Sequence, residues 1–125
     1  MTKYSKHIKK KLLIFDFDGV LADSINNMEI SWIHVRDKFN LKSNFDDYKK
    51  HLGLPFEEII KIIEPKKLSK VDIIKSSYFN KSSISISSVK LYPDVKKTIK
   101  LLKLNGKIIC IITSKNFQRV NQILR

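Results

Sequence analysis

Cysteine, glycine and proline are scarce in this chain of 125 residues: cysteine occurs once, and glycine and proline occur three times each. The single cysteine, Cys110, excludes a disulfide within the chain and argues against a disulfide-stapled secreted domain. Because Cys110 lies in the apolar run IICII, we expect a buried structural thiol. This cysteine usage fits a reducing, cytoplasmic location.

Long hydrophobic runs are also absent. The run before Asp16, residues 12–15, has four residues, whereas a secretory h-region needs roughly 7–15, so we expect no signal peptide. No stretch approaches the ~18 apolar residues of a membrane span, so we expect no membrane partner. The hydrophobic content of 42% is enough for a core. The length predicts one domain, or one domain with a small insert.

Arginine and acidic residues are few beside lysine, and the formal net charge is +13. Such a charge raises the alternative of a basic polyanion-binding protein. However, arginine, which suits base readout and bidentate phosphate recognition, occurs only at Arg36, Arg119 and Arg125. The lysines are spread along the whole chain, and the Lys-Ile-Asn bias is typical of an AT-rich genome. A nucleic-acid partner is therefore the less favoured hypothesis.

The apolar pattern predicts strands over 11–17 and 107–112, the second being typical of a buried parallel strand. Periodicity and capping residues indicate helices over 25–39, 45–51, 55–63, 68–79, 95–105 and 116–125. The Ser-rich segment 81–90 is predicted to be a linker, with a short strand as the alternative. Residues 1–10 are expected to be a frayed basic lead-in. Helices that lead into parallel strands predict an α/β fold.

Two aspartates, Asp16 and Asp18, follow the first strand, and Gly19 comes directly after them. Alternation along a strand places both carboxylates on one side and Phe17 on the other. Two carboxylates this close repel each other, and their burial is costly without compensation. A divalent cation or a proton-transfer role would account for them, and Mg²⁺ is the expected ion because it prefers carboxylate oxygens.

A second polar pair, Thr113 and Ser114, follows the strand over 107–112. Parallel strands collect ligands at their carboxyl ends, so this pair and the aspartates are expected to meet. A strand-end carboxylate is a suitable nucleophile toward phosphorus, and a neighbouring one can move the proton of the leaving group. The Thr113 hydroxyl, with the N–H groups that begin the next helix, would hold phosphate oxygens.

These motifs resemble those of the haloacid dehalogenase-like hydrolases, in the phosphoglycolate phosphatase and β-phosphoglucomutase-like branch. DFDGVLADS is similar to the DxDGxxxDS loop of that family. LYPDVKKTIKLLKLNGKIICIITSK is similar to the segment from the end of the cap to the second motif, and HLGLPFEEII to a turn in the helical cap. The resemblance covers roughly residues 11 to 125.

The resemblance implies a Rossmann-like parallel sheet core, of which this chain holds the N-terminal part. Residues 11–21 and 89–125 would form this partial core, and residues 22–88 a helical cap with the Ser-rich linker at its C-terminal end. The implied activity is hydrolysis of small phosphorylated metabolites with Mg²⁺. Asp16 would be the phosphorylated nucleophile and Asp18 the general acid/base, and both would lie at the metal, Asp18 through its backbone carbonyl. Thr113, with Ser114, would bind phosphate.

The chain departs from the family pattern after the second motif. Members carry a later lysine that steadies the phosphate and one or two acidic residues that complete the magnesium site, whereas no acidic residue follows Asp94 here. Lys115 is a weak substitute for that lysine. A truncated, catalytically inactive fragment and a phosphomutase therefore remain alternatives to a phosphatase. A continuation or a complementing chain would have to carry the missing motifs.

Overall fold

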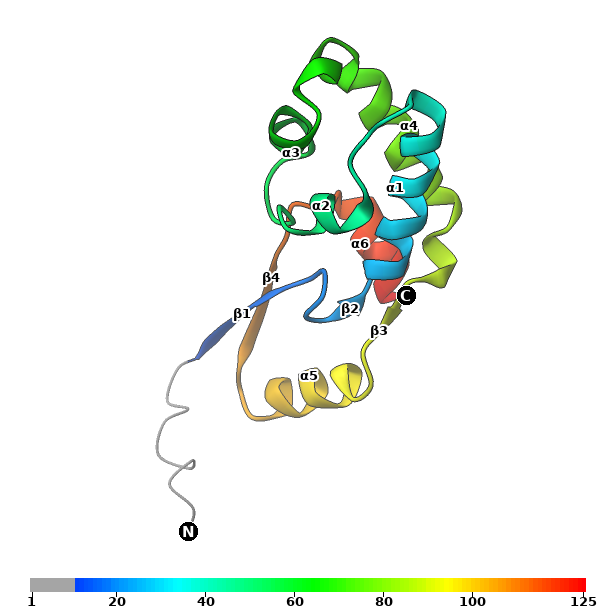
Figure 1. Cartoon of the computed structure of the whole chain (residues 1–125). Helices are drawn as coiled ribbons and strands as arrows, with labels where there is room; N and C mark the ends of the chain where they lie inside the picture. Colours follow the sequence, from blue (N-terminus) through cyan, green and yellow to red (C-terminus); the bar gives the residue numbers. More distant parts are fainter. Residues whose placement is uncertain (1–10) are drawn as a thin grey trace.

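The computed structural model describes residues 11–125, and the lead-in expected over residues 1–10 lies outside this part of the chain. Two short sheets and a series of helices follow one another along the sequence (Figure 1). Their bounds are β1 Leu12–Asp16, β2 Ala22–Asp23, α1 Ile25–Phe39, α2 Phe45–Lys49, α3 Phe56–Ile63, a 3₁₀ helix Pro65–Lys70, α4 Val71–Ile84, a 3₁₀ helix Ile86–Ser88, β3 Lys90–Leu91, α5 Val95–Leu104, β4 Ile108–Ile112 and α6 Phe117–Leu124.

The strands β1 and β4 pair in parallel, in a register that sets Leu12 opposite Ile108 and Asp16 opposite Ile112. Helix α5 lies between them in the sequence and provides the crossover that parallel strands need. A second, antiparallel pair joins β2 to β3 where the chain leaves β1 and later returns. The expected α/β class with a parallel sheet is confirmed.

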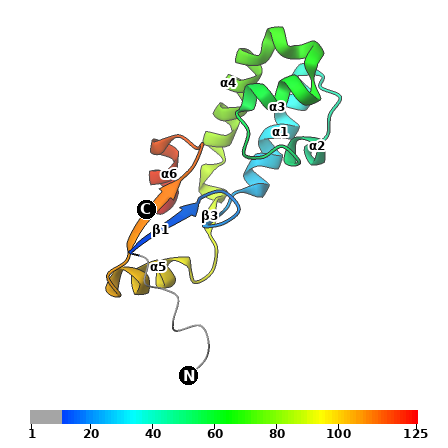
Figure 2. The ribbon, with the colours of Figure 1, turned by 90° about the vertical axis from the view of Figure 1, so that its left-hand side faces the viewer.

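Helices α1 to α4 gather beyond the carboxyl ends of β1 and β4 (Figure 2). They share a hydrophobic cluster, and Trp32, Val35, Ile60 and Ile74 are each 0% exposed in it. Tyr48 stacks on Trp32 with 4.6 Å between the ring centroids. Burial of such rings contributes roughly 1.5–3 kcal/mol each. The helical part therefore has a core of its own.

A second hydrophobic cluster holds the strands to the helices on one face of the sheet. Phe17 and Ala22 are fully buried in it, and Val120 of α6 packs with them. Phe15 and Ile111, which point to this face from β1 and β4, are partly buried against the same cluster. The division into a core of 11–21 and 89–125 and a cap of 22–88 stays a prediction.

Two helix starts behave differently from each other. The Asn44 side chain accepts a hydrogen bond from the Asp47 N–H at 3.0 Å, and the Asp47 carboxylate accepts one from the Asn44 N–H at 3.1 Å. This capping box makes Asn44 the cap of α2. Asp94 precedes α5 with a φ of 64° and makes no side-chain cap. Its left-handed backbone forms the turn that enters α5.

The Ser-rich segment is neither a linker throughout nor a strand. Helix α4 continues to Ile84, beyond the expected end at residue 79, and a 3₁₀ turn follows before β3. The Ser83 hydroxyl donates to the Phe79 carbonyl at 2.9 Å, and Ser85 donates to Lys81 in the same way at 3.2 Å. Serines that bond to carbonyls one turn earlier are compatible with a helix. Local composition therefore predicted this segment wrongly.

The expectation of a buried Cys110 is also wrong, because its thiol is exposed. Burial was expected on the assumption that both faces of a parallel sheet are covered. Here the face that carries Cys110 is open. Its other large side chains, at Leu12, Ile14, Ile108 and Ile112, are 49%, 57%, 62% and 61% exposed.

Within residues 11–125, no helix has the length and apolar character that a membrane crossing requires.

Candidate active site

The loop after β1 is built around Phe17 and Gly19. The buried Phe17 carbonyl accepts hydrogen bonds from the N–H groups of Leu21 and Ala22 at 2.9 and 3.0 Å. Gly19 has a φ of 74°, a backbone conformation that side chains disfavour, and its N–H donates to the Ala22 carbonyl. The tight loop leaves Asp16 exposed at the end of the strand, with one carboxylate oxygen accepting from the Phe17 N–H at 2.7 Å.

Asp18 is held by two groups that come from different parts of the chain. The Ser24 hydroxyl donates to Oδ1 of Asp18 at 2.7 Å. The Lys115 ammonium lies 3.2 Å from the same oxygen. Ser24 directly precedes α1, yet its side chain makes no cap hydrogen bond. Its hydroxyl instead helps to fix the Asp18 carboxylate.

Lys115 is the cation that pairs with Asp18 in this structure. Its side chain is 7% exposed, and burial lowers the pKa of the amine, while the Asp18 charge acts in the opposite direction. An ion pair this buried costs desolvation and strongly constrains both partners. The like-charge repulsion expected between Asp16 and Asp18 is therefore relieved in part by a lysine.

Thr113 and Ser114 lie between β4 and α6, at the edge where β1 also ends. The Thr113 hydroxyl accepts a hydrogen bond from the Lys115 N–H at 3.0 Å. Asn116 caps α6 through its side chain, which accepts from the Gln118 N–H at 2.8 Å. The loop is thus ordered by its own polar groups, and the positive end of the α6 dipole lies next to it.

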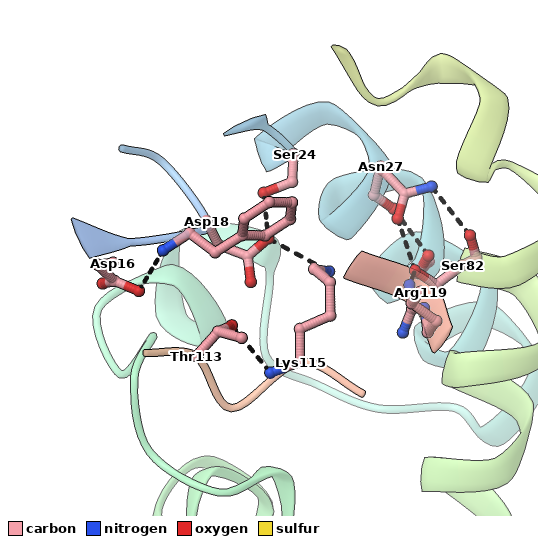
Figure 3. A network of polar contacts seen from close by, with 10 residues as sticks. Asp16, Asp18, Ser24, Asn27, Ser82, Thr113, Lys115 and Arg119 are labelled. Carbon is pink, nitrogen blue, oxygen red and sulfur yellow. Dashed lines mark hydrogen bonds and ion pairs between the residues drawn. The ribbon is translucent and has the colours of Figure 1, made fainter. Parts of the chain in front are cut away.

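The structure brings the four predicted site residues to one cavity of about 550 Å³ between the sheet and the helices. Asp16 and Asp18 enter from the end of β1 and the loop after it, and Thr113 enters from the loop after β4 (Figure 3). Ser114 lines the cavity beside Thr113. Helices α3 and α4 supply much of the opposite wall. The residues of α3 and α4 that line the cavity include Phe56, Lys75, Tyr78, Phe79 and Ser82.

Sequence reasoning missed a polar network at the side of this cavity. Asn27 of α1 and Ser82 of α4, each 2% exposed, exchange hydrogen bonds: the Asn27 Nδ2 donates to the Ser82 carbonyl at 3.1 Å, and the Ser82 hydroxyl donates to Asn27 Oδ1 at 2.6 Å. Arg119 of α6 donates to the Ser82 hydroxyl (Figure 3). No local signal marks these residues, because they are far apart in the sequence. The rarity of arginine was the available hint.

The carboxyl oxygens at the loop suit Mg²⁺ in kind but fall short in number. One Asp16 oxygen is free of the Phe17 contact, whereas both partners of Asp18 bind its Oδ1. Within residues 11–125, no three side chains of the His, Cys, Asp or Glu type cluster as a metal site. Mg²⁺ requires near-octahedral coordination, so further ligands would have to join the two aspartates.

Comparison with known proteins agrees with this geometry. The sequence profile of the family described as haloacid dehalogenase-like hydrolase matches residues 13–125. The chain therefore belongs to the haloacid dehalogenase-like hydrolases. A phosphoglycolate phosphatase from Haemophilus influenzae is 24% identical to it over an alignment 127 residues long. The alignment covers 91% of this chain and 56% of that protein.

Solved structures show the same fold. A haloacid dehalogenase-like hydrolase from Bacteroides fragilis superimposes with a TM-score of 0.84 at 27% identity, over 94% of this chain and 57% of that one. A protein from Haemophilus somnus, predicted to be a phosphoglycolate phosphatase, superimposes with a TM-score of 0.73 at 20% identity, over 90% and 57%. This chain spans just over half the length of the relatives that it matches.

Proposed function

We propose that this chain carries the nucleophile and part of the phosphate site of a magnesium-dependent phosphatase that acts on small phosphorylated metabolites. The meeting of Asp16 and Asp18 with Thr113 in one cavity is the observation that carries the proposal. Family membership supports hydrolysis, and the phosphatase relatives support phosphate esters as the class of substrate. Phosphoryl transfer depends mainly on positioning and charge neutralisation, which this cavity can provide in part.

In this mechanism the Asp16 carboxylate attacks phosphorus and forms an aspartyl-phosphate, while the bond to the ester oxygen breaks. Asp18 donates a proton to the departing oxygen, and then takes one from the water that hydrolyses the aspartyl-phosphate. Ser24 and Lys115 hold Asp18 in position for both steps. Thr113 and the N–H groups before α6 bind the phosphoryl oxygens.

A bound magnesium ion would neutralise charge on the phosphate and its attacking carboxylate. The Asp16 carboxylate and the Asp18 backbone carbonyl are the groups that would hold it. We propose that a continuation of the chain or a complementing polypeptide, equivalent to the part of the relatives that this chain does not match, supplies the remaining acidic ligands and the phosphate-binding lysine. Full activity depends on both parts.

The test is phosphate release from p-nitrophenyl phosphate, with and without magnesium. The chain is assayed alone and mixed with the unmatched C-terminal segment of the Haemophilus influenzae relative. We expect magnesium-dependent release in the mixture. Asp16→Asn removes the nucleophile and should lower the rate by about 10³-fold or more, because loss of such a group removes most of the chemical catalysis.

Asp72→Asn is the matched control, because Asp72 is an exposed aspartate on α4 outside the cavity. This variant should keep the full rate. An Asp16→Asn variant as active as the parent chain would show that the nucleophile is misassigned. A mixture whose activity does not depend on magnesium would contradict the metal requirement.

A further inference from the structure

The charged side chains that line the cavity leave one cation without an acidic partner. Three carboxylates and three cations contribute to the lining: Asp16, Asp18, Glu57, Lys75, Lys115 and Arg119. Lys115 pairs with Asp18, and Lys75 pairs with Glu57. In the described residues 11–125, no carboxylate lies within ion-pair distance of Arg119. Among the charged residues of the lining, Asp16 and Arg119 are therefore the two that form no ion pair within residues 11–125.

Arg119 is held rigidly where it lines the cavity. The residue is 9% exposed, and its guanidinium lies 5.4 Å from the centre of the Phe79 ring. One terminal nitrogen donates to the hydroxyl of Ser82, which Asn27 fixes in turn. The position of the charge is therefore set by α1, α4 and α6 together, and little entropy is lost when an anion binds to it.

The hydrogen bonding of this guanidinium is incomplete. Its Nε is buried and has no hydrogen-bond partner among residues 11–125. Burial also lowers the pKa of Arg119, although an arginine remains charged at neutral pH. A buried charge without a counterion is unfavourable, and buried donors are normally satisfied. An anion within the cavity would supply the missing partner, and the planar guanidinium suits a carboxylate or a phosphate.

We propose that Arg119 determines substrate specificity by binding a second anionic group, a carboxylate or a phosphate, on the leaving part of the substrate. The inference rests on the proposed function, because Asp16 then marks where the reacting phosphoryl group lies. Asp16 and Arg119 lie on opposite sides of Asp18 and Lys115 in Figure 3. A substrate that carries an anion at each end would present its phosphoryl group to Asp16, and its second anion would compensate the charge of Arg119.

The experiment compares two non-hydrolysable probes by isothermal titration calorimetry in magnesium buffer, with the full chain mixed with the same C-terminal segment of the Haemophilus influenzae relative as in the phosphatase assay. The first, 3-phosphonopropionate, has a phosphonate and a carboxylate, and the second, propylphosphonate, lacks the carboxylate. We expect the first to bind about 10- to 100-fold more tightly, as a charge-assisted contact allows. Arg119→Gln should remove this preference and leave the affinity for propylphosphonate nearly unchanged.

Arg125→Gln is the matched control, because it removes the same charge from an exposed residue outside the cavity. It should keep the preference. Arg119→Lys keeps a positive charge but lacks the planar guanidinium, so it should keep part of the preference for 3-phosphonopropionate. The decisive quantity is the ratio of the affinities for the two probes, and it is measured on the parent chain. A folding defect in one variant therefore does not prevent the test.

Equal affinity of the parent chain for the two probes would overturn the inference and leave the proposed phosphatase standing. Binding of neither probe would contradict the phosphate site itself, and with it both proposals. If Arg119→Gln lowers the melting temperature but keeps the preference, Arg119 is only a structural tie between α6 and α4, and the inference fails.

Discussion

Asp18 has a more constrained environment than its neighbour Asp16. Its carboxylate receives a hydroxyl and an ammonium, and its side chain is 20% exposed. Asp16 lies at the end of β1 and is exposed, and within residues 11–125 its side chain binds only a backbone N–H. This difference suits the proposed roles. A nucleophile must be reachable, whereas a proton donor must be held at a fixed angle to the leaving group.

At the scale of single residues, the buried phenol of Tyr48 predicts how the free energy of unfolding depends on pH. Burial raises the pKa of its phenol from 10.0 to about 12, and raises the pKa of Tyr78 well above 10.0. Because the folded pKa is the higher one, the stability from the neutral phenol is complete below pH 10.0 and is lost as the pH rises toward about 12. Tyr48 should lower the free energy of unfolding by about 1.4 kcal/mol per pH unit in this window.

Urea unfolding across that pH range checks the prediction. Tyr48→Phe keeps the ring stacked on Trp32 and removes the ionisable hydroxyl, so its stability should fall less steeply with pH than that of the parent chain. Identical slopes for the two proteins would show that the Tyr48 hydroxyl titrates normally when folded.

At the scale of single elements, the residues that begin a helix contribute to the stability of the fold. The start of α2 has a side-chain cap and the start of α5 has none. Asn44→Ala removes the capping box of α2 and should cost about 1 kcal/mol. Asp94→Gly removes a side chain that caps nothing and relieves a left-handed backbone. We expect it to leave stability unchanged or to raise it by up to about 1 kcal/mol. Urea denaturation of both variants measures this, and a loss in Asp94→Gly as large as in Asn44→Ala would contradict it.

The two helix starts also show how far sequence reasoning reaches at this scale. Asn44 caps α2 through a capping box, whose two residues lie three apart in the sequence. Ser24 and Asp94 have the right residue types for caps, yet one side chain bonds to Asp18 and the other lies at a turn with positive φ. Residue type alone does not distinguish a cap from a polar residue that another segment recruits.

The open face of the β1–β4 sheet is the main feature of the whole molecule. Within the described chain each strand pairs only with the other, so each has one edge without a partner strand. Beside Cys110, this face exposes the large aliphatic side chains of Leu12, Ile14, Ile108 and Ile112. Apolar faces and free strand edges of this kind mark surfaces that another polypeptide covers, or that self-associate when nothing covers them.

We therefore predict that the isolated chain binds the dye ANS and forms concentration-dependent oligomers. Replacing Ile14 and Ile112 by threonine should reduce both effects, because their side chains lie on the open face at 57% and 61% exposure. Ile62→Thr is the control, since Ile62 is 50% exposed on α3. Sedimentation velocity and ANS fluorescence measure the outcome. A parent chain that stays monomeric and does not bind the dye would contradict the prediction.

The local pattern of residues predicted the two strands of the parallel sheet, most helix starts and the four candidate site residues, because periodicity, capping and strand ends are short-range properties. The antiparallel pair of β2 and β3 was not predicted. Only the tertiary structure decided that the Ser-rich segment completes α4, that Cys110 is exposed, and that Lys115 pairs with Asp18. The tertiary structure also buries Arg119 at a place where no carboxylate of residues 11–125 pairs with it. These outcomes depend on which distant surfaces meet, since burial and ion pairing are set by contacts between elements.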